Sequence, residues 1–446
     1  MSTIDREEYY YNFVSRRIEQ TLTIIGSIRN KINERGLFLL ALNEVRREGI
    51  VLLTFPVSEF HGRLNKTKKM MADAGIDVLL ITDPANMNYL TGYDAWSFYV
   101  NQLLVVMIDE EQPYWIGRGQ DASAARHTTW LDEEHIFPYA DDYVQSIIKH
   151  PMDFVCDFLK MKKRDKQTVA VELDAYYFTA KCYIRLTHGL PNATFKDGTN
   201  LVNWVRIIKS EQEITYIKHA GRIAEKAMQV AFDTIDEGVR QCDVAAGIAH
   251  AQISGTADFG GDYPSIVPLL PTGDRTSACH LTWTDEAFKQ GDPVIIELAG
   301  CYKRYHAPLA RTVVIGGPTE QMQHLADVVM EGISTALDVV KPGVTCEEVE
   351  LAWRNVIVKS GIVKESRIGY SMGLNYPPDW GEHTASLRPG DRTVLEPNMT
   401  FHMIPGIWLD DIGIEISESF RVTETGCEVF ANFPRELYVK PHIRLA

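Results

Sequence analysis

Between residues 54 and 203, apolar positions follow a helical spacing first and the spacing of strands afterwards. Phe60, Leu64 and Met71 lie on one stripe, which predicts a helix with one buried face that ends at Gly75. Short, mostly apolar segments follow, as in strands separated by turns. They are Asp77–Ile81, Leu103–Ile108 and Tyr114–Ile116, with a turn expected at Pro84 and Asn86. This alternation predicts a small α/β domain.

A second unit, residues 204–446, opens with a clear helix start. Ser210 and Glu213 form a capping box, and apolar residues at helical spacing continue from there to Ile235. Two further helices are expected near residues 320–340 and 345–360, and Thr345 and Glu348 form a capping box that opens the second of them. The strands expected in this unit are Pro293–Ala299, Ala310–Ile315, Thr400–Ile404 and Ile412–Ile416. Long helices combined with such strands predict an α+β arrangement, in which helices back a curved sheet.

Residues 1–53 fit neither pattern. They mix charged and apolar residues, and we expect an N-terminal extension of one or two helices, to which no function is assigned. The three segments are therefore a helical extension (1–53), an α/β domain (54–203) and an α+β domain (204–446).

Composition and charge exclude several classes of function. The formal net charge is -15 and no basic stripe is present, so the chain repels phosphate backbones and nucleic-acid binding is not expected. No apolar run approaches the ~20 residues of a membrane span, and the charged amino terminus does not resemble a secretory signal. The seven cysteines are scattered, which favours reduced thiols in the cytoplasm over a disulfide framework.

One carboxylate lies inside the most apolar expected strand, Asp292–Gly300. Strand alternation places Glu297 on the same face as Ile295 and Ala299. A buried carboxylate is costly unless it meets a cation or is protonated. One interpretation is a structural ion pair with Arg311. The interpretation that we favour is that Glu297 meets a cationic substrate or acts on it.

The order of motifs resembles the creatinase/prolidase/methionine aminopeptidase superfamily over about residues 55–440. The resemblance rests on Arg206, the helix start at Ser210, Arg311-Thr312 and Pro405-Gly406. It implies the pita-bread fold for the C-terminal domain, preceded by a smaller creatinase-type α/β domain. It also implies a homodimer, in which the N-terminal domain of one chain, around Trp96, approaches the active-site pocket of the other.

Peptidases of this superfamily bind metal through five side chains, and only the first of these positions can still coordinate well here, with Glu in place of Asp. Glu297 stands at the first position, and Pro308, Tyr370, Ile404 and Ser417 stand at the others. Proline and isoleucine offer no side-chain donor, so we expect no metal ion and no other cofactor.

Within the superfamily, five blocks of sequence resemble the ectoine hydrolases. They are residues 82–99, 280–283, 297–309, 376–382 and 399–408. Ectoine is a small cyclic amidine that bears a carboxylate, and an amidinium carbon is electrophilic without help from a metal. The resemblance therefore implies a metal-independent hydrolase that opens this ring to N-acetyl-2,4-diaminobutyrate. Most of the first fifty residues have no counterpart in those enzymes.

The resemblance also implies roles for individual residues. Glu297 attacks the amidine carbon or activates a water against it. His280 is the expected proton shuttle, with a hydrogen-bonded core histidine as the other interpretation. Glu415 is a third catalytic candidate, or else part of a salt bridge. The candidate substrate-binding residues are Trp96, Tyr305, His306, Arg311, Tyr370, Asp379 and Trp408, with Arg304 as a second possible partner for the substrate carboxylate.

Some aspects stay open at this level. Asp379 and Glu382 lie in a proline-rich turn and are as easily turn or surface acids. The alternatives to ectoine hydrolysis are another creatinase-like amidine or guanidine hydrolase and a metal-free pseudo-peptidase that only binds partners. A dimethylsulfoniopropionate lyase of this fold uses metals, and the missing ligands argue against it.

Overall fold

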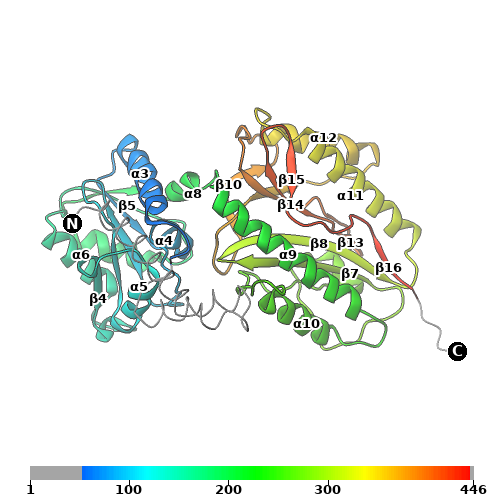
Figure 1. Cartoon of the computed structure of the whole chain (residues 1–446), viewed down its shortest axis with the longest axis horizontal. Helices are drawn as coiled ribbons and strands as arrows, with labels where there is room; N and C mark the ends of the chain where they lie inside the picture. Colours follow the sequence, from blue (N-terminus) through cyan, green and yellow to red (C-terminus); the bar gives the residue numbers. More distant parts are fainter. Residues whose placement is uncertain (1–52, 442–446) are drawn as a thin grey trace, which may run out of the picture. The chain divides into compact units, whose positions relative to one another are not determined.

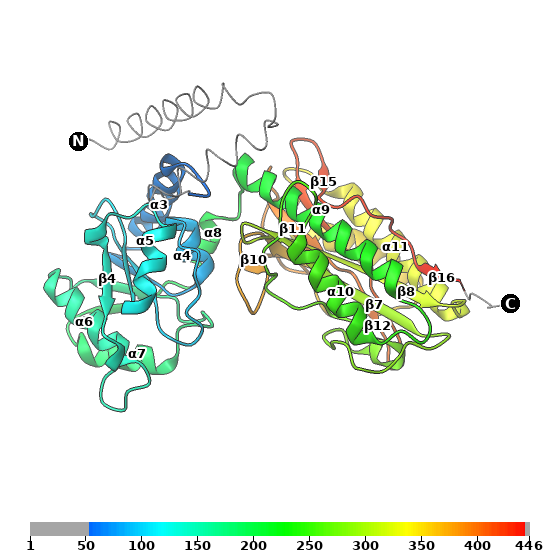
Figure 2. The same ribbon diagram turned by 60° about the horizontal axis from the view of Figure 1, so that its bottom comes forward.

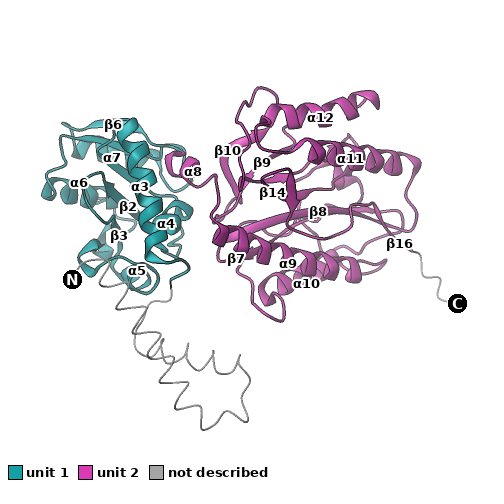
Figure 3. Cartoon of the chain, turned by 45° about the horizontal axis from the view of Figure 1, so that its top comes forward, with its two compact units in different colours: residues 1–199 teal, residues 200–446 magenta. Residues whose placement is uncertain are grey.

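The computed structural model describes residues 53–441, which form two compact units. Unit 1 ends at Thr199 and unit 2 begins at Asn200, a few residues before the boundary expected from the sequence (Figure 3). The expected helical extension, residues 1–53, lies outside the described residues except for its last position.

Unit 1 is built on one six-stranded sheet with the strand order β4-β3-β2-β1-β5-β6 (Figure 1). Neighbouring strands are parallel except for the two pairs that involve β2. The strands are β1 (Val78–Ile81), β2 (Leu103–Met107), β3 (Tyr114–Arg118), β4 (Ile136–Tyr139), β5 (Thr168–Val171) and β6 (Thr194–Asp197). The helices are α3 (Val57–Asp73), α4 (Pro84–Thr91), α5 (Ala122–Thr128), α6 (Pro151–Met161) and α7 (Ala180–Gly189).

The turn expected at Pro84 is wrong, because Pro84 is the first residue of helix α4. The Asp83 side chain caps the helix by accepting from the Ala85 amide at 2.8 Å, and proline is favourable at a first helical position. Every residue of α4 is buried, so the helix has no polar face that a sequence pattern reveals. By contrast, helix α3 ends two residues before Gly75, which adopts the positive φ of 62° typical of a helix end.

Up to residue 441, unit 2 combines five helices with three sheets (Figures 1 and 2). The largest sheet has the order β10-β9-β11-β14-β15, and the others are β16-β8-β7 and β12-β13. The helices are α8 (Leu201–Val205), α9 (Glu211–Thr234), α10 (Gln241–Ser254), α11 (Glu320–Val339) and α12 (Cys346–Lys359). The strands are β7 (Pro293–Tyr302), β8 (Tyr305–Ile315), β9 (Gly369–Met372), β10 (Gly381–Leu387), β11 (Thr400–Met403), β12 (Ile407–Trp408), β13 (Gly413–Ile414), β14 (Glu418–Val422), β15 (Cys427–Val429) and β16 (Tyr438–Lys440).

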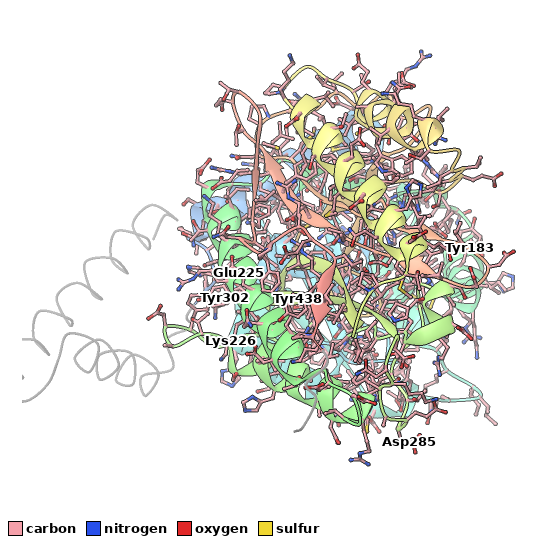
Figure 4. The ribbon with its side chains drawn as sticks, turned by 90° about the vertical axis from the view of Figure 1, so that its right-hand side faces the viewer. Tyr183, Glu225, Lys226, Asp285, Tyr302 and Tyr438 are labelled. Carbon is pink, nitrogen blue, oxygen red and sulfur yellow. The ribbon has the colours of Figure 1, made fainter. Side chains whose placement is uncertain are left out.

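Two helix pairs cover these sheets. Helices α9 and α10 pack with the long hairpin β7–β8, and helices α11 and α12 share a core with the five-stranded sheet. The capping boxes expected at Ser210 and Thr345 are present. Helix α9 is amphipathic, with Ala224 and Ala227 in the core and Lys226 on the outer face (Figure 4).

Strand β7 and helix α9 approach each other unusually closely at Gly300. A Cβ atom at this position would lie 1.9 Å from the carbonyl oxygen of Ala220 on α9. Only glycine fits such a contact, so the depth of β7 beneath α9 is fixed here. No helix among residues 53–441 has the length and apolarity that spanning a membrane requires.

Candidate active site

Glu297 lies in the middle of strand β7, with its side chain buried. Its backbone pairs with Ala310 of β8 on one side. On the other side it pairs with Leu269, whose amide donates to the Glu297 carbonyl at 2.8 Å and whose carbonyl accepts from the Glu297 amide at 3.1 Å. Burial, and then the charge of Asp379, raise the pKa of Glu297 to about 7. Within the described part of the chain no hydrogen bond or ion pair stabilises the charged carboxylate. Glu297 is therefore a buried acid of the kind expected at a functional site.

A second buried acid, Glu415, interacts electrostatically with the first. Its backbone amide and carbonyl both bond the hydroxyl of Thr312 at 2.9 Å, which ties the segment between β13 and β14 to strand β8. Both of its carboxylate oxygens are buried and have no hydrogen-bond partner among the described residues. Burial, and then the charge of Glu297, raise the pKa of Glu415 well above its usual range. The salt bridge considered for Glu415 is absent from residues 53–441.

A cation and a thiol interact electrostatically with this site: Lys364 with Glu415, and Cys279 with both acids. The ammonium of Lys364 lies 4.2 Å from the ring centroid of Trp408. Burial lowers the pKa of Lys364 to about 8, and the charge of Glu415 opposes that shift. Burial, and then the charges of Glu415 and Glu297, raise the pKa of the Cys279 thiol. Sequence reasoning missed Lys364 and Cys279, because both lie in irregular segments without a motif of their own.

Tyr370 belongs to a hydrogen-bonded chain that occupies two of the changed metal positions. Its hydroxyl lies 3.0 Å from Nδ1 of His402 and accepts a hydrogen bond of 2.8 Å from the indole of Trp380. On the other side of the ring, Nε2 of His402 lies 2.8 Å from the hydroxyl of Ser417. Burial lowers the pKa of His402 to about 3, so its imidazole is neutral at ordinary pH. The sequence offered a hint of His402, a single histidine in a short buried strand, but we assigned it no role.

The two acids of the proline-rich turn have different environments. Asp379 is partly exposed, and its charge contributes to the field at Glu297. Burial opposes its ionisation, but the hydrogen bonds from His383 (2.6 Å) and the Gly381 amide (2.9 Å) lower the pKa of Asp379. Glu382 is fully buried and forms an ion pair with Lys209, so the interpretation of Glu382 as a turn or surface acid is wrong.

Tyr305 and His306 are both buried on strand β8 and contact protein groups. The Tyr305 hydroxyl donates to Glu213 at 2.8 Å, at the first turn of α9. Nε2 of His306 accepts from the Ser265 amide at 2.9 Å, and burial lowers the pKa of His306 to about 4. Their role in substrate binding stays a prediction.

The expectation that Arg311 holds the substrate carboxylate is wrong. All five of its N–H donors are used inside unit 2, on carbonyl oxygens and on the carboxylate of Glu418 at 2.8 Å. The side chain is fully buried, and it is cross-strand from Ile296, so it does not pair with Glu297 either. Arg304, the other candidate, lies over the ring of Tyr263 at 4.1 Å.

Two further expected residues, His280 and Trp96, belong to different units of the chain. His280 is exposed, and it is the preceding residue, Cys279, whose pKa responds to Glu297 and Glu415. Trp96 is partly buried in unit 1, against Phe98 at 5.1 Å between ring centroids. The roles of His280 and Trp96 stay predictions.

The residues at the five metal positions do not fit a dinuclear metal site. Pro308 and Ile404 have no donor atom in their side chains, and Tyr370 and Ser417 are hydrogen-bonded to His402. Within residues 53–441 no group of three or more histidine, cysteine, aspartate or glutamate side chains is arranged to hold a metal ion.

Comparison with known families identifies the scaffold. The creatinase/prolidase N-terminal domain matches residues 63–208, and metallopeptidase family M24 matches residues 215–424. The chain belongs to family M24. An uncharacterized hydrolase/peptidase of Sinorhizobium fredii is 49% identical over 87% of this chain and 99% of its own length. The ectoine hydrolase of Halomonas elongata is 46% identical over 87% of this chain and 99% of its own length. This M24 protein is a hydrolase that acts on carbon–nitrogen bonds.

Solved structures confirm the expected fold. A dipeptidase from Mycobacterium ulcerans has a TM-score of 0.73 and covers 87% of this chain, at 22% identity. A prolidase from Thermococcus sibiricus has a TM-score of 0.74 and covers 85% of this chain, at 21% identity. Unit 2 is thus a pita-bread domain, and unit 1 is the smaller α/β domain of the creatinase type.

Proposed function

We propose that this M24 hydrolase opens the cyclic amidine ring of ectoine, giving N-acetyl-2,4-diaminobutyrate, and that it needs no metal ion to do so. The observation that carries the proposal is the pair of buried acids, Glu297 and Glu415, to which no cation is bonded within the described residues. A cationic ligand relieves their repulsion, and the amidinium of ectoine is such a cation. The similarity to the Halomonas elongata ectoine hydrolase supports the same substrate.

The two acids suit the two halves of the reaction. Ring opening adds one water: the oxygen stays on the amidine carbon as an acetamide, and one ring nitrogen leaves as an amine that needs a proton. Ionised Glu297 attacks the carbon or takes a proton from the attacking water. The pKa of Glu415 is raised well above its usual range, and Glu415 is the acid that supplies the proton to the leaving nitrogen. His280 remains a candidate for exchanging that proton with solvent.

The carboxylate of ectoine needs a cation, and Lys364 is the residue that we propose for it. Its side chain is buried next to Trp408, and its ammonium has no ion pair among the described residues. Arg311 is excluded because its donors are all in use. A substrate with an amidinium at one end and a carboxylate at the other matches the acids and Lys364 together.

The metal-independent part of the proposal is supported by the donor set. Four of the five positions that hold metal in the peptidases offer either no donor or a hydroxyl that is already hydrogen-bonded. An amidinium carbon is electrophilic by itself, so the reaction does not require a Lewis acid.

The test is ring opening of ectoine followed by mass spectrometry, with creatine and an Xaa-Pro dipeptide as alternative substrates. The wild type should convert ectoine to a product heavier by one water. Glu297→Gln should lower the rate of ring opening by ~10²–10⁴-fold if Glu297 is a general base, and by more if it is a nucleophile. Glu286→Gln is the matched control, because this glutamate is exposed, and it should retain wild-type activity.

Hydrolysis of creatine or of the dipeptide, with ectoine left unchanged, would refute the proposal that ectoine is the substrate. Ectoine turnover by Glu297→Gln at the wild-type rate would refute the mechanism. Binding of ectoine without any product would favour the pseudo-peptidase.

The proposal extends to the assembly and location of the enzyme. We propose a cytoplasmic homodimer, in which Trp96 of one chain approaches the site of the other. All seven cysteines are free thiols, which supports the location. Light scattering that reports a monomer at assay concentration would remove Trp96 from the site.

A further inference from the structure

The hydrogen bonds around His402 allow only two arrangements of protons. Nδ1 of the ring faces the Tyr370 hydroxyl at 3.0 Å, and Nε2 faces the Ser417 hydroxyl at 2.8 Å. A neutral imidazole has one N–H and one acceptor nitrogen. Two fixed donors complete the chain, since the Trp380 indole donates to Tyr370 at 2.8 Å and the Ala310 amide donates to Ser417 at 2.7 Å.

In the first arrangement the proton lies on Nε2. His402 then donates to the Ser417 hydroxyl, which already accepts from the Ala310 amide, and Tyr370 donates to Nδ1. The hydrogen of the Ser417 hydroxyl is left over. Ser417 is completely buried, and no other acceptor for it is found among residues 53–441. A buried donor without a partner is costly.

In the second arrangement the proton lies on Nδ1. The Ser417 hydroxyl donates to Nε2, and Nδ1 donates to the Tyr370 oxygen, which also accepts from Trp380. Every buried donor is now used. The one hydrogen left over belongs to the Tyr370 hydroxyl, and Tyr370 is partly exposed and lies in the field of Glu297. The second arrangement therefore moves the unused donor from a buried position to the reaction site.

We infer that Ser417 and His402 are positioning residues, which hold the Tyr370 hydroxyl with its hydrogen directed at an anionic oxygen in the site. This inference rests on the proposed function and deepens it. The anionic oxygen belongs either to the substrate carboxylate or to Glu297. Toward that oxygen Tyr370 acts as a hydrogen-bond donor and not as a base, since burial, and then the charge of Glu297, keep its pKa well above the usual range. Two positions that hold metal in the peptidases thus supply one oriented hydrogen bond.

The tautomer of His402 is measured directly by ¹⁵N NMR of ring-labelled histidine, without substrate. The His402→Asn spectrum assigns the signal. The wild type should show the Nδ1–H form of a neutral ring. Ser417→Ala removes the hydroxyl that selects between the two arrangements, so the preference for the Nδ1–H form should weaken, whereas Ser417→Thr should keep the wild-type tautomer. A wild-type ring with its proton on Nε2 would overturn the inference, whatever the substrate proves to be.

Kinetics of ectoine opening provide the second readout. Tyr370→Phe should lower kcat/KM for ectoine by ~10²–10³-fold, the loss expected when one oriented hydrogen-bond donor is removed. A loss in kcat assigns the acceptor to Glu297, and a rise in KM assigns it to the substrate carboxylate. Ser417→Ala should lower the activity about 10–100-fold, which is the loss typical when a residue that orients another group is removed. Ser417→Thr should recover most of that activity. Wild-type activity in Ser417→Ala would contradict the positioning role even if ectoine is the substrate.

Discussion

The ammonium of Lys209 lies 2.9 Å from Oε2 of Glu382, and both side chains are completely shielded from solvent. Lys209 immediately precedes the cap of helix α9, and Glu382 lies on strand β10. The ammonium also donates to the Ile207 carbonyl at 3.0 Å. This ion pair ties the start of the long helix to the edge of the five-stranded sheet.

Removal of Glu382 should therefore destabilise the fold strongly. Glu382→Ala leaves a buried lysine charge without its partner, and the expected loss is roughly 3–5 kcal/mol of the free energy of unfolding. Urea denaturation measures it. The double variant Glu382→Ala/Lys209→Met should recover part of the loss, since it removes the unpaired charge as well. A loss below about 1 kcal/mol, the value typical of a surface acid, would contradict the buried pair.

Replacement of Glu415 by glutamine should stabilise the protein at alkaline pH. The pKa of Glu415 is raised in the folded state, so the folded protein holds this proton more tightly than the unfolded chain does. Stability is then highest below the unfolded pKa and falls as pH rises toward the folded pKa. Glu415→Gln abolishes that fall. Its melting temperature should exceed that of the wild type at pH 8 by roughly 2–4 °C per kcal/mol of burial and repulsion cost removed, with no such gain at pH 4. An equal difference at both pH values would contradict the raised pKa.

Lys364 should act on substrate affinity. Lys364→Met keeps most of the length of the side chain but removes the charge, and a hydrogen bond to a charged group is worth about 1.5–3 kcal/mol. The expected result is a rise in KM for ectoine of about 10–100-fold with a smaller change in kcat. Lys364→Arg should retain part of the affinity, and Lys359→Met on the neighbouring helix α12 is a matched control. A fall in kcat alone would assign Lys364 to the chemistry of Glu415 instead.

Metal content should separate this chain from the peptidases of its family. Purified protein should hold no stoichiometric transition metal by elemental analysis, and incubation with a chelator should leave ectoine opening unchanged. The reason is chemical, since Pro308 and Ile404 provide no ligand. Two metal ions per chain together with inactivation by the chelator would refute the metal-independent mechanism.

The sequence was informative where one local pattern determines the outcome. The capping boxes at Ser210 and Thr345 and the apolar run around Glu297 predicted α9, α12 and β7, because caps and strand alternation are local signals. Helix α4 was missed because it is buried on all sides and has no amphipathic stripe.

The site could be predicted only in part, because its contacts join distant segments. Arg311 looked like a free cation, but carbonyl groups of Phe433 and Pro434, more than a hundred positions away, take up its donors. His402 meets Ser417 only through the pairing of β11 with β14, which no motif encodes. The sequence identified Glu297 as a buried acid, but it could not show that Cys279 lies in its electrostatic field or that Lys364 lies in that of Glu415.

The contact of Gly300 with helix α9 has a consequence for how this site changes over time. A slip of β7 along the helix would bring another residue to that spot, and no side chain fits 1.9 Å from the Ala220 oxygen. The strand accordingly has one register, and position 297 stays at the same depth whichever residue occupies it. The reacting group can be exchanged without refolding the strand that carries it. A scaffold built in this way would allow a family to change the side chain at this one position while the strand that presents it stays as it is.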